Sequence, residues 1–212
     1  MRRTSFLCLA LCILTFSKAH TQSLFRQPSY AVRFFYGSFL TRQPKAQYLR
    51  DSYSYCGEFS LVQQTDGRKA WQRANALPQV GVAAFYGNSG SKKQIGSMAG
   101  VFPFVAWQLF QNKKLQSGLR AGAGLGYIQK PYDKITNHKN VLIGTHGNAY
   151  INFLWQTEAL LFSNLHVNAG LSFSHFSNGS STLPNLGLNI PALAFGLRYG
   201  LTKKIDTHNR AR

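Results

Sequence analysis

The sequence is poor in acidic residues and cysteines, and most of it lacks long apolar runs. Six Asp and Glu residues oppose 24 Lys and Arg residues in 212 positions. Cys8 and Cys12 lie in an N-terminal apolar segment, so Cys56 stands alone in the rest of the chain, which excludes an internal disulfide there. Beyond that segment no stretch approaches about 18 uninterrupted apolar residues, and no long helical periodicity is present, which excludes a helical membrane span.

Residues 1–21 have the pattern of an export signal. Arg2 and Arg3 precede an apolar run, Phe6–Phe16, which small and polar residues follow. The run is too short to span a bilayer. We expect cleavage before Gln22, which leaves residues 22–212 as a single domain.

The remaining domain is strongly basic. Without Arg2, Arg3 and Lys18 it keeps 21 basic residues against six acidic ones, a net charge of about +15. Such a charge favours an anionic partner: nucleic acid, a membrane surface or a phosphorylated ligand. Export makes nucleic acid the least favoured of these, and no nucleic-acid-binding signature is visible.

Segments rich in Val, Phe, Tyr, Leu and Gly alternate with turn residues, which predicts β-strands. There are eight: Ala31–Leu40, Tyr55–Gln64, Gln79–Tyr86, Ser97–Gln111, Leu115–Gln129, Val141–Gln156, Leu165–Ser177 and Ile190–Leu201. An even number of antiparallel strands is what an up-and-down barrel requires.

The two faces of these segments differ in character. In Leu115–Tyr127 the odd positions are mainly apolar, whereas the even ones are Gly, Gln and Arg. A soluble β-sandwich, the alternative, would carry Lys and Glu on its polar face. The pattern instead favours an all-β, eight-stranded antiparallel up-and-down transmembrane β-barrel of the bacterial outer membrane, with an apolar face toward lipid.

Basic residues gather in three of the four connections expected to face outside. They are Arg42, Lys45 and Arg50; Lys92 and Lys93; and Lys130, Lys134 and Lys139. The fourth connection, residues 179–189, carries no charge. This distribution suits a ligand that has phosphates at its edge, although exposed loops also carry charges without such a role.

The stretch FSHFSNGSSTLPNLGLN, residues 173–189, places polar groups on the face expected to meet lipid. His175 and Ser177 continue the odd, apolar register of the seventh segment. Residues i and i+2 of a strand lie about 6.6 Å apart on one face, so the imidazole can reach the hydroxyl as a general base reaches a nucleophile. The alternative is that both are ordinary interfacial residues.

Neighbouring residues can supply the other roles of an acyl-transfer site. The Asn178 amide and a backbone N–H of Gly179 or Ser180 are candidate oxyanion donors. Asn189 has the parity of His175 on the adjacent segment, so its amide oxygen can hold the imidazole. Asn178-Gly179-Ser180 also fits the N-glycosylation sequon, a common coincidence. His146 and Asn148 are interpreted as packed interior residues, and no metal-ligand spacing is visible.

The run His175-Phe176-Ser177-Asn178, followed by Pro184-Asn185 and Gly187, resembles the signature of PagL-type lipid A 3-O-deacylases, the acyloxyacyl hydrolase family. Residues 143–148, IGTHGN, resemble the pattern on the preceding strand of that family. The resemblance implies an outer-membrane barrel that needs no cofactor and removes an ester-linked acyl chain from lipid A of lipopolysaccharide. It also implies that His175 is the base, Ser177 the nucleophile, and Asn178 with the Ser180 N–H the oxyanion donors.

Asn189 departs from the family pattern, which has a glutamate twelve residues after the serine. An amide can orient a histidine but cannot give the imidazolium a full counter-charge. Three hypotheses follow: Asn189 supports a slower enzyme, another acid replaces it, or the barrel is non-enzymatic and binds lipopolysaccharide or acts as a structural protein or adhesin. The remaining acids are Asp51, Glu58, Asp66, Asp133, Glu158 and Asp206.

Overall fold

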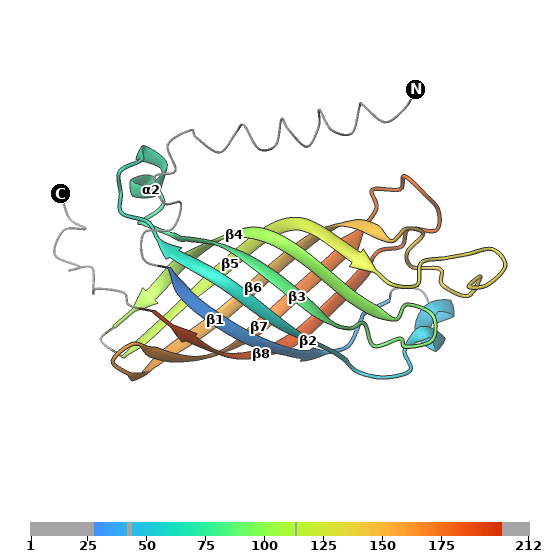
Figure 1. The fold of residues 1–212 in the computed structure, drawn as a ribbon, viewed down its shortest axis with the longest axis horizontal. Helices are drawn as coiled ribbons and strands as arrows, with labels where there is room; N and C mark the ends of the chain where they lie inside the picture. Colours follow the sequence, from blue (N-terminus) through green and yellow to red (C-terminus); the bar gives the residue numbers. More distant parts are fainter. Residues whose placement is uncertain (1–27, 42–43, 113, 201–212) are drawn as a thin grey trace, which may run out of the picture.

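The structure, a computed structural model, describes residues 28–41, 44–112 and 114–200. It contains eight strands: β1 (Ser29–Gly37), β2 (Ser54–Gln64), β3 (Gln79–Asn88), β4 (Ser97–Gln111), β5 (Leu115–Ile128), β6 (Gly147–Phe162), β7 (Leu165–Ser177) and β8 (Leu188–Tyr199). Each strand pairs antiparallel with the next, and β1 pairs with β8, so the sheet closes into a barrel (Figure 1). The predicted fold class is confirmed. The predicted signal segment, residues 1–21, lies outside the described residues.

The connections at the two ends of the barrel differ in length. The loops after β1, β3, β5 and β7 extend from one end, which we call the long-loop end (Figure 1). At the opposite end lie two short turns and the β2–β3 connection, which carries the short helix α2 (Ala70–Ala74). Longer loops of outer-membrane barrels face outside, which agrees with the predicted orientation. No helix in the described part of the chain is long and apolar enough to cross a bilayer.

Side chains alternate between the outside and the inside of the barrel along each strand, as the sequence predicts. In β1 and in most of β6 every second residue is buried and the ones between are exposed. The exposed set is apolar and continues around the wall; it includes Val32, Phe34, Leu125, Phe153, Leu171, Leu193, Phe195 and Leu197. An apolar band of this extent needs lipid against it.

The sixth strand begins later than predicted. The segment predicted as Val141–Gln156 corresponds to β6, which starts only at Gly147 and continues past the predicted end to Phe162. Leu142 and Ile143 are fully buried, and the Asn140 side-chain oxygen accepts hydrogen bonds from both of their backbone N–H groups. This oxygen replaces a sheet partner, so the two apolar side chains fold inward over the barrel end. Ile143 therefore does not face lipid. The other strands differ from their predicted ranges by no more than three residues at either end.

His146, predicted to face the interior, lies on the outside. Its ring stacks on that of Tyr127, with centroids 5.5 Å apart and an interplanar angle of 10°. Its Nδ1 lies 2.9 Å from the Ile128 carbonyl oxygen. Because β6 starts at Gly147, His146 belongs to the loop, and strand alternation does not fix its direction.

The barrel interior toward the short-turn end is filled by a network of buried ion pairs. Arg120 binds Glu58 through two hydrogen bonds of 2.6 and 2.8 Å, and Arg33 binds the same carboxylate at 3.1 Å. Arg198 binds Glu158 at 2.6 Å, and Arg33 lies 3.9 Å from Glu158. Three guanidinium groups and two carboxylates thus pair across the lumen, so that each buried carboxylate lies between two arginines and one positive charge remains in excess.

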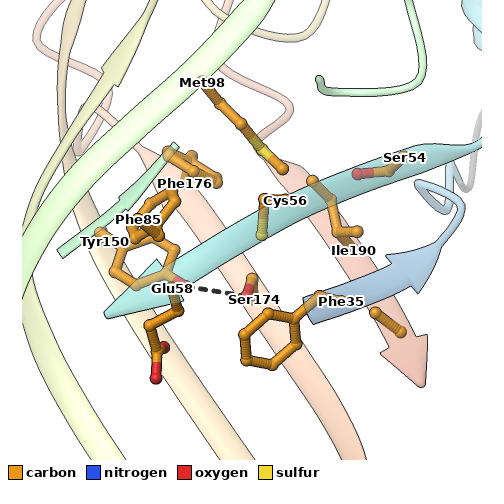
Figure 2. A pocket seen from close by; sticks show the side chains of 11 residues that line it. Phe35, Ser54, Cys56, Glu58, Phe85, Met98, Tyr150, Ser174, Phe176 and Ile190 are labelled. Carbon is orange, nitrogen blue, oxygen red and sulfur yellow. Dashed lines mark hydrogen bonds between the residues drawn. The ribbon is translucent and has the colours of Figure 1, made fainter. Parts of the chain in front are cut away.

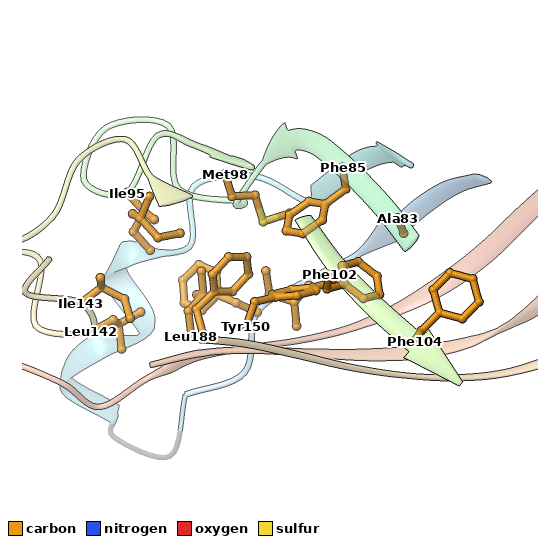
Figure 3. Packing of buried hydrophobic residues seen from close by; sticks show 14 of the residues in the cluster. Ala83, Phe85, Ile95, Met98, Phe102, Phe104, Leu142, Ile143, Tyr150 and Leu188 are labelled. Atoms are coloured by element: carbon orange, nitrogen blue, oxygen red, sulfur yellow. The ribbon is translucent and has the colours of Figure 1, made fainter. Parts of the chain in front are cut away.

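The interior toward the long-loop end is apolar. The Tyr150 ring packs against Phe85, Phe102 and Phe176 with centroid distances of 4.5 to 5.0 Å. Side chains from the long loops and from the start of β8 join the same core, and Figure 3 labels four of them: Ile95, Leu142, Ile143 and Leu188. Phe39 and Leu49 belong to the same cluster. The long loops therefore close this end of the barrel.

Candidate active site

His175 and Asn189 lie opposite each other on β7 and β8, and both point outward. They are direct partners in the β7–β8 register. His175 Nδ1 lies 2.7 Å from Asn189 Oδ1. Because an amide oxygen only accepts, Nδ1 carries the hydrogen of this bond and Nε2 is left as the basic nitrogen of the neutral ring. The predicted relation between the two residues is present in this geometry.

Ser177 lies two residues beyond His175 on the same outward face, at the last position of β7. Its Oγ accepts hydrogen bonds from Asn185 Nδ2 at 3.0 Å and from the Gly179 N–H at 3.2 Å. Among the described residues, no hydrogen bond joins the His175 ring to the Ser177 hydroxyl. The strand spacing leaves Oγ within reach of Nε2 after a side-chain rotation, and such bonds are commonly long before substrate binds.

The two predicted oxyanion donors are engaged within the β7–β8 loop. Asn178 Nδ2 donates to the Thr182 carbonyl oxygen at 2.8 Å, and the Ser180 N–H donates to Asn178 Oδ1 at 2.9 Å. Ser180 has a φ of +62°, in the left-handed region. The Ser180 N–H must leave its present partner before it can reach an oxyanion at Ser177, whereas the Asn178 amide has a second N–H that donates to no described residue.

Asn185 is the site residue for which the sequence suggested no chemical role. Besides its bond to Ser177, its side-chain oxygen accepts the Asn178 N–H at 3.3 Å. The available signal was its place in the Pro184-Asn185 pair of the family signature, for which the sequence suggested no contact with Ser177. The amide therefore ties the end of β7 to the returning loop.

The β5–β6 loop braces the β7–β8 loop from the side. Ile143 and Asn185 form an isolated antiparallel bridge, and the Gly187 N–H donates to the Leu142 carbonyl oxygen at 3.1 Å. Gly187 has a φ of +74°, and a Cβ on it would lie 2.8 Å from His175 Cε1. Only glycine fits this approach. The buried Leu142 and Ile143 thus fix the loop that holds Asn185.

No described carboxylate reaches the His175 ring. Glu58 and Glu158 bind arginines in the lumen, and Asp66 pairs with Arg68. Asp51 accepts the backbone N–H groups of Lys92 and Lys93, and Asp133 accepts those of Ile135 and Thr136. Asp206 lies outside the described residues. Asn189 is therefore the hydrogen-bond partner of His175 in the described part of the chain.

The surface around the pair is apolar and open to lipid. Ile151 lies beside His175 and Ala149 beside Ser177 on β6, and Phe173 precedes them on β7 opposite Pro191 of β8. Ile151 and Phe173 are 38% and 40% exposed. An acyl chain embedded in the outer leaflet can lie along these residues and present its ester to Ser177.

The lumen offers no comparable space. The cavity in Figure 2 has a volume of about 20 Å³, room for about one water molecule. Its lining includes Cys56, Glu58 and Met98, and the Tyr150 hydroxyl lies 2.9 Å from Ser174 Oγ across one side of it (Figure 2). A cavity of this size cannot admit an acyl chain, so within the described residues the outer surface is the face open to a lipid substrate. No group of three or more potential metal ligands occurs among the described His, Cys, Asp and Glu residues.

Comparison with known proteins finds one matching family model and several similar barrels. Residues 57–198 match the model of the lipid A 3-O-deacylase (PagL) family. No curated protein matches the sequence. Among solved structures, Neisserial surface protein A (NspA) is 9% identical with a TM-score of 0.56, and the alignment covers 81% of this chain and 96% of NspA. This likeness shows the fold.

Two further structures are less similar. The outer membrane enzyme PagL is 15% identical over 78% of this chain and 97% of its own, with a TM-score of 0.48. The attachment invasion locus protein Ail of Yersinia pestis is 8% identical over 84% of this chain and 99% of its own, with a TM-score of 0.41.

Proposed function

The chain belongs to the lipid A 3-O-deacylase (PagL) family of outer-membrane β-barrels, and from this premise we propose that it is a serine esterase that removes an ester-linked acyl chain from lipid A. The observation that carries the proposal is the His175–Asn189 hydrogen bond beside Ser177, on the lipid-facing side of the wall. Polar groups in that position need a purpose, because hydrocarbon penalises them.

The reaction begins with proton transfer within the pair. His175 Nε2 takes the hydroxyl proton as Ser177 Oγ attacks the ester carbonyl, and a tetrahedral oxyanion forms. Collapse of the oxyanion breaks the ester bond, His175 returns the proton to the sugar oxygen, and the acyl group remains on Ser177. A water molecule activated by His175 then releases the fatty acid and restores the serine.

Asn189 orients the ring for both proton transfers. Its Oδ1 accepts from Nδ1, which keeps Nε2 directed at the serine. The amide gives the imidazolium less stabilisation than a carboxylate would, since hydrogen bonds with an ionised partner are roughly twice as strong. This favours a slower enzyme than family members with a glutamate.

Donors for the oxyanion come from the loop after β7. The Asn178 amide and the Ser180 N–H stay the predicted donors, and the Ser180 N–H needs a change of partner to act. Asn185 Nδ2 already lies 3.0 Å from Ser177 Oγ. It can turn to the oxyanion without such a rearrangement, so we add it to the proposed site.

Export is part of the proposal. Residues 1–21 would act as a signal peptide that is removed, and the reaction would need neither metal nor cofactor.

The experiment is an assay of fatty-acid release. The purified barrel is incubated with lipid A, and the released acid and the shortened lipid are followed by mass spectrometry. We expect release by the unmutated protein and none above background by Ser177→Ala. Equal release by both proteins would refute a serine mechanism.

A non-enzymatic barrel that binds lipopolysaccharide is the second candidate. Asn189, in place of the acid expected from the family, is the observation that favours it. In that case lipid A binds the folded barrel, but neither protein releases fatty acid.

A further inference from the structure

A polar depression lies on the outside of the barrel above β5, beside the candidate active site. It has a volume of about 640 Å³. Its lining includes Lys93, Lys130 and His146, with Asp133, Thr136 and Asn137 among the other residues. Two ammonium groups and an imidazole thus border a space that opens at the level of the long loops.

The depression has a fixed frame. Lys130 Nζ donates to the carbonyl oxygens of Lys92 and Lys93 at 3.0 and 3.3 Å, which ties the β5–β6 loop to the β3–β4 loop. Asn137 Nδ2 donates to the carbonyl oxygens of Gln94 and Pro131, both at 2.8 Å. A frame held in this way requires little ordering when a ligand binds.

The charge of the depression is positive. No described carboxylate forms an ion pair with Lys93 or Lys130, and Lys93 donates no side-chain hydrogen bond to a described residue. Asp133 is the acid in the lining, and its Oδ1 accepts hydrogen bonds from the N–H and hydroxyl of Thr136. These bonds lower the pKa of Asp133. Within the lining, one negative charge, already bonded within its own loop, therefore faces two lysines. Asp51 lies outside the lining, where it accepts the backbone N–H of Lys93 and attracts the Lys93 side chain.

The strand register relates the depression to Ser177. Ala149 of β6 lies opposite Ser177, and Gly147 lies opposite Tyr127, the residue on which His146 stacks. At about 3.3 Å per residue along β6 and about 4.8 Å between strands, the Cα atoms of Tyr127 and Ser177 are about 12 Å apart. Gly147 has open space above it. A glucosamine disaccharide can span this distance along the headgroup level.

We propose that this depression binds a phosphate group on the sugar headgroup of the lipid substrate, with the ammonium groups of Lys93 and Lys130 as its donors and the His146 ring at its border. The phosphate then acts as an anchor that fixes which ester lies over Ser177. Ammonium groups bind phosphate as point charges. The inference rests on the proposed lipid A substrate, and its test separates binding from turnover.

The test uses the full barrel in detergent with the Ser177→Ala substitution, so that lipid is bound without turnover. The dissociation constants of phosphorylated lipid A and of the same lipid after phosphatase treatment are measured by fluorescence. We expect the phosphorylated form to bind about tenfold tighter, the factor that one charged hydrogen bond supplies. Adding Lys93→Gln should remove this preference.

Lys134→Gln is the matched control, because Lys134 is exposed in the β5–β6 loop, which also carries Lys130, and lies outside the lining. It should keep the preference. Equal losses with Lys93→Gln and Lys134→Gln would mean diffuse attraction and overturn the site, as would an unchanged preference in Lys93→Gln. If inorganic phosphate binds as tightly as the lipid-borne group, the depression is a free-anion site and the lipid assignment is wrong.

The test compares dissociation constants, so its result does not depend on whether the barrel hydrolyses lipid A. One outcome separates the two proposals: Lys93→Gln loses the preference for phosphorylated lipid A, and the unmutated protein releases no fatty acid. This result would support the phosphate site and refute only the proposed function.

Discussion

Polar side chains lie in two regions of this barrel, the lumen and the outer face of β7 and β8, and the two regions differ in the hydrogen-bond partners that they provide. In the lumen, Arg33 and Arg120 share the carboxylate of Glu58 at distances of 2.6 to 3.1 Å, away from water and lipid. On the outer face of β7 and β8, His175 has the uncharged Asn189 as its partner at 2.7 Å. Both acids that the strands contribute are thus bonded to arginines, and none lies near the histidine.

The contrast separates a structural role from a chemical one. A buried charge is stable only when its partners are present, so the carboxylates of the lumen network are committed to their arginines and cannot take part in proton transfer. At the outer pair, one imidazole nitrogen has no partner among the described residues, and the serine hydroxyl is held by weaker neutral bonds. A group that must give or take a proton needs this freedom.

The largest effect is expected from His175→Ala. It removes the base but leaves the lumen untouched, so fatty-acid release should fall about 10⁴-fold while the barrel stays folded. Release is followed by mass spectrometry, and folding by heat-modifiable migration. His138→Ala, an exposed loop histidine, is the control and should keep its activity. A fall of similar size in the control would show that the loss is not specific to the pair.

Glu58→Gln tests the ion-pair network in the lumen. The change leaves Arg120 without a counter-charge in the lumen and leaves Arg33 only Glu158, at 3.9 Å, so the free energy of unfolding should decrease by about 3–5 kcal/mol. Urea unfolding in lipid vesicles measures it. The activity per folded molecule should not change.

Asp66→Asn serves as its comparison, because Asp66 pairs with Arg68 where both side chains are about half exposed. Exposed pairs contribute about 0–1 kcal/mol. If Asp66→Asn destabilised the barrel as much as Glu58→Gln, the structural importance of the lumen network would be refuted.

Asn185→Ala should lower kcat about 10²-fold, the cost of losing one donor to an oxyanion, with little change in KM. Asn178→Ala is the matched change on the neighbouring amide. Because Asn178 donates to Thr182 while Asn185 donates to Ser177, the loss should be greater for Asn185. If steady-state kinetics showed a greater loss of kcat in Asn178→Ala than in Asn185→Ala, Asn178 and not Asn185 would be the main oxyanion donor.

Asn189→Asp places a negatively charged carboxylate beside His175, in the position where the outer pair now has an amide. The two side chains have the same shape, and a carboxylate at 2.7 Å stabilises the imidazolium more than an amide does. We expect kcat to rise about tenfold, the factor that corresponds to about 1.4 kcal/mol. Asn189→Ala should lower it instead. An equal kcat with Asn, Asp and Ala at position 189 would mean that this position does not orient the histidine.

Much of the fold was predictable because alternation is a local property of the sequence. The same parity that places Phe173 and Leu171 outside also places His175 there, and the equal parity of Asn189 predicted its cross-strand position. Contacts across the lumen were not predictable. Glu58 and Arg120 are 62 residues apart and meet only because the sheet closes.

Loops account for the other differences between prediction and structure. Leu142 and Ile143 have strand-like character, yet the side chain of Asn140 binds their N–H groups and turns them into the core. The contact of Asn185 with Ser177 likewise depends on the path of an eight-residue return, which no periodicity describes.

Covalent labelling of Ser177 tests the central claim most directly. The folded barrel is treated with a lipid phosphonate that reacts with activated serines, digested, and mapped by mass spectrometry. The account predicts one adduct, on Ser177, that disappears in His175→Ala and decreases when lipid A competes. A folded barrel with Ser177 unlabelled, or labelled equally well without His175, would contradict it.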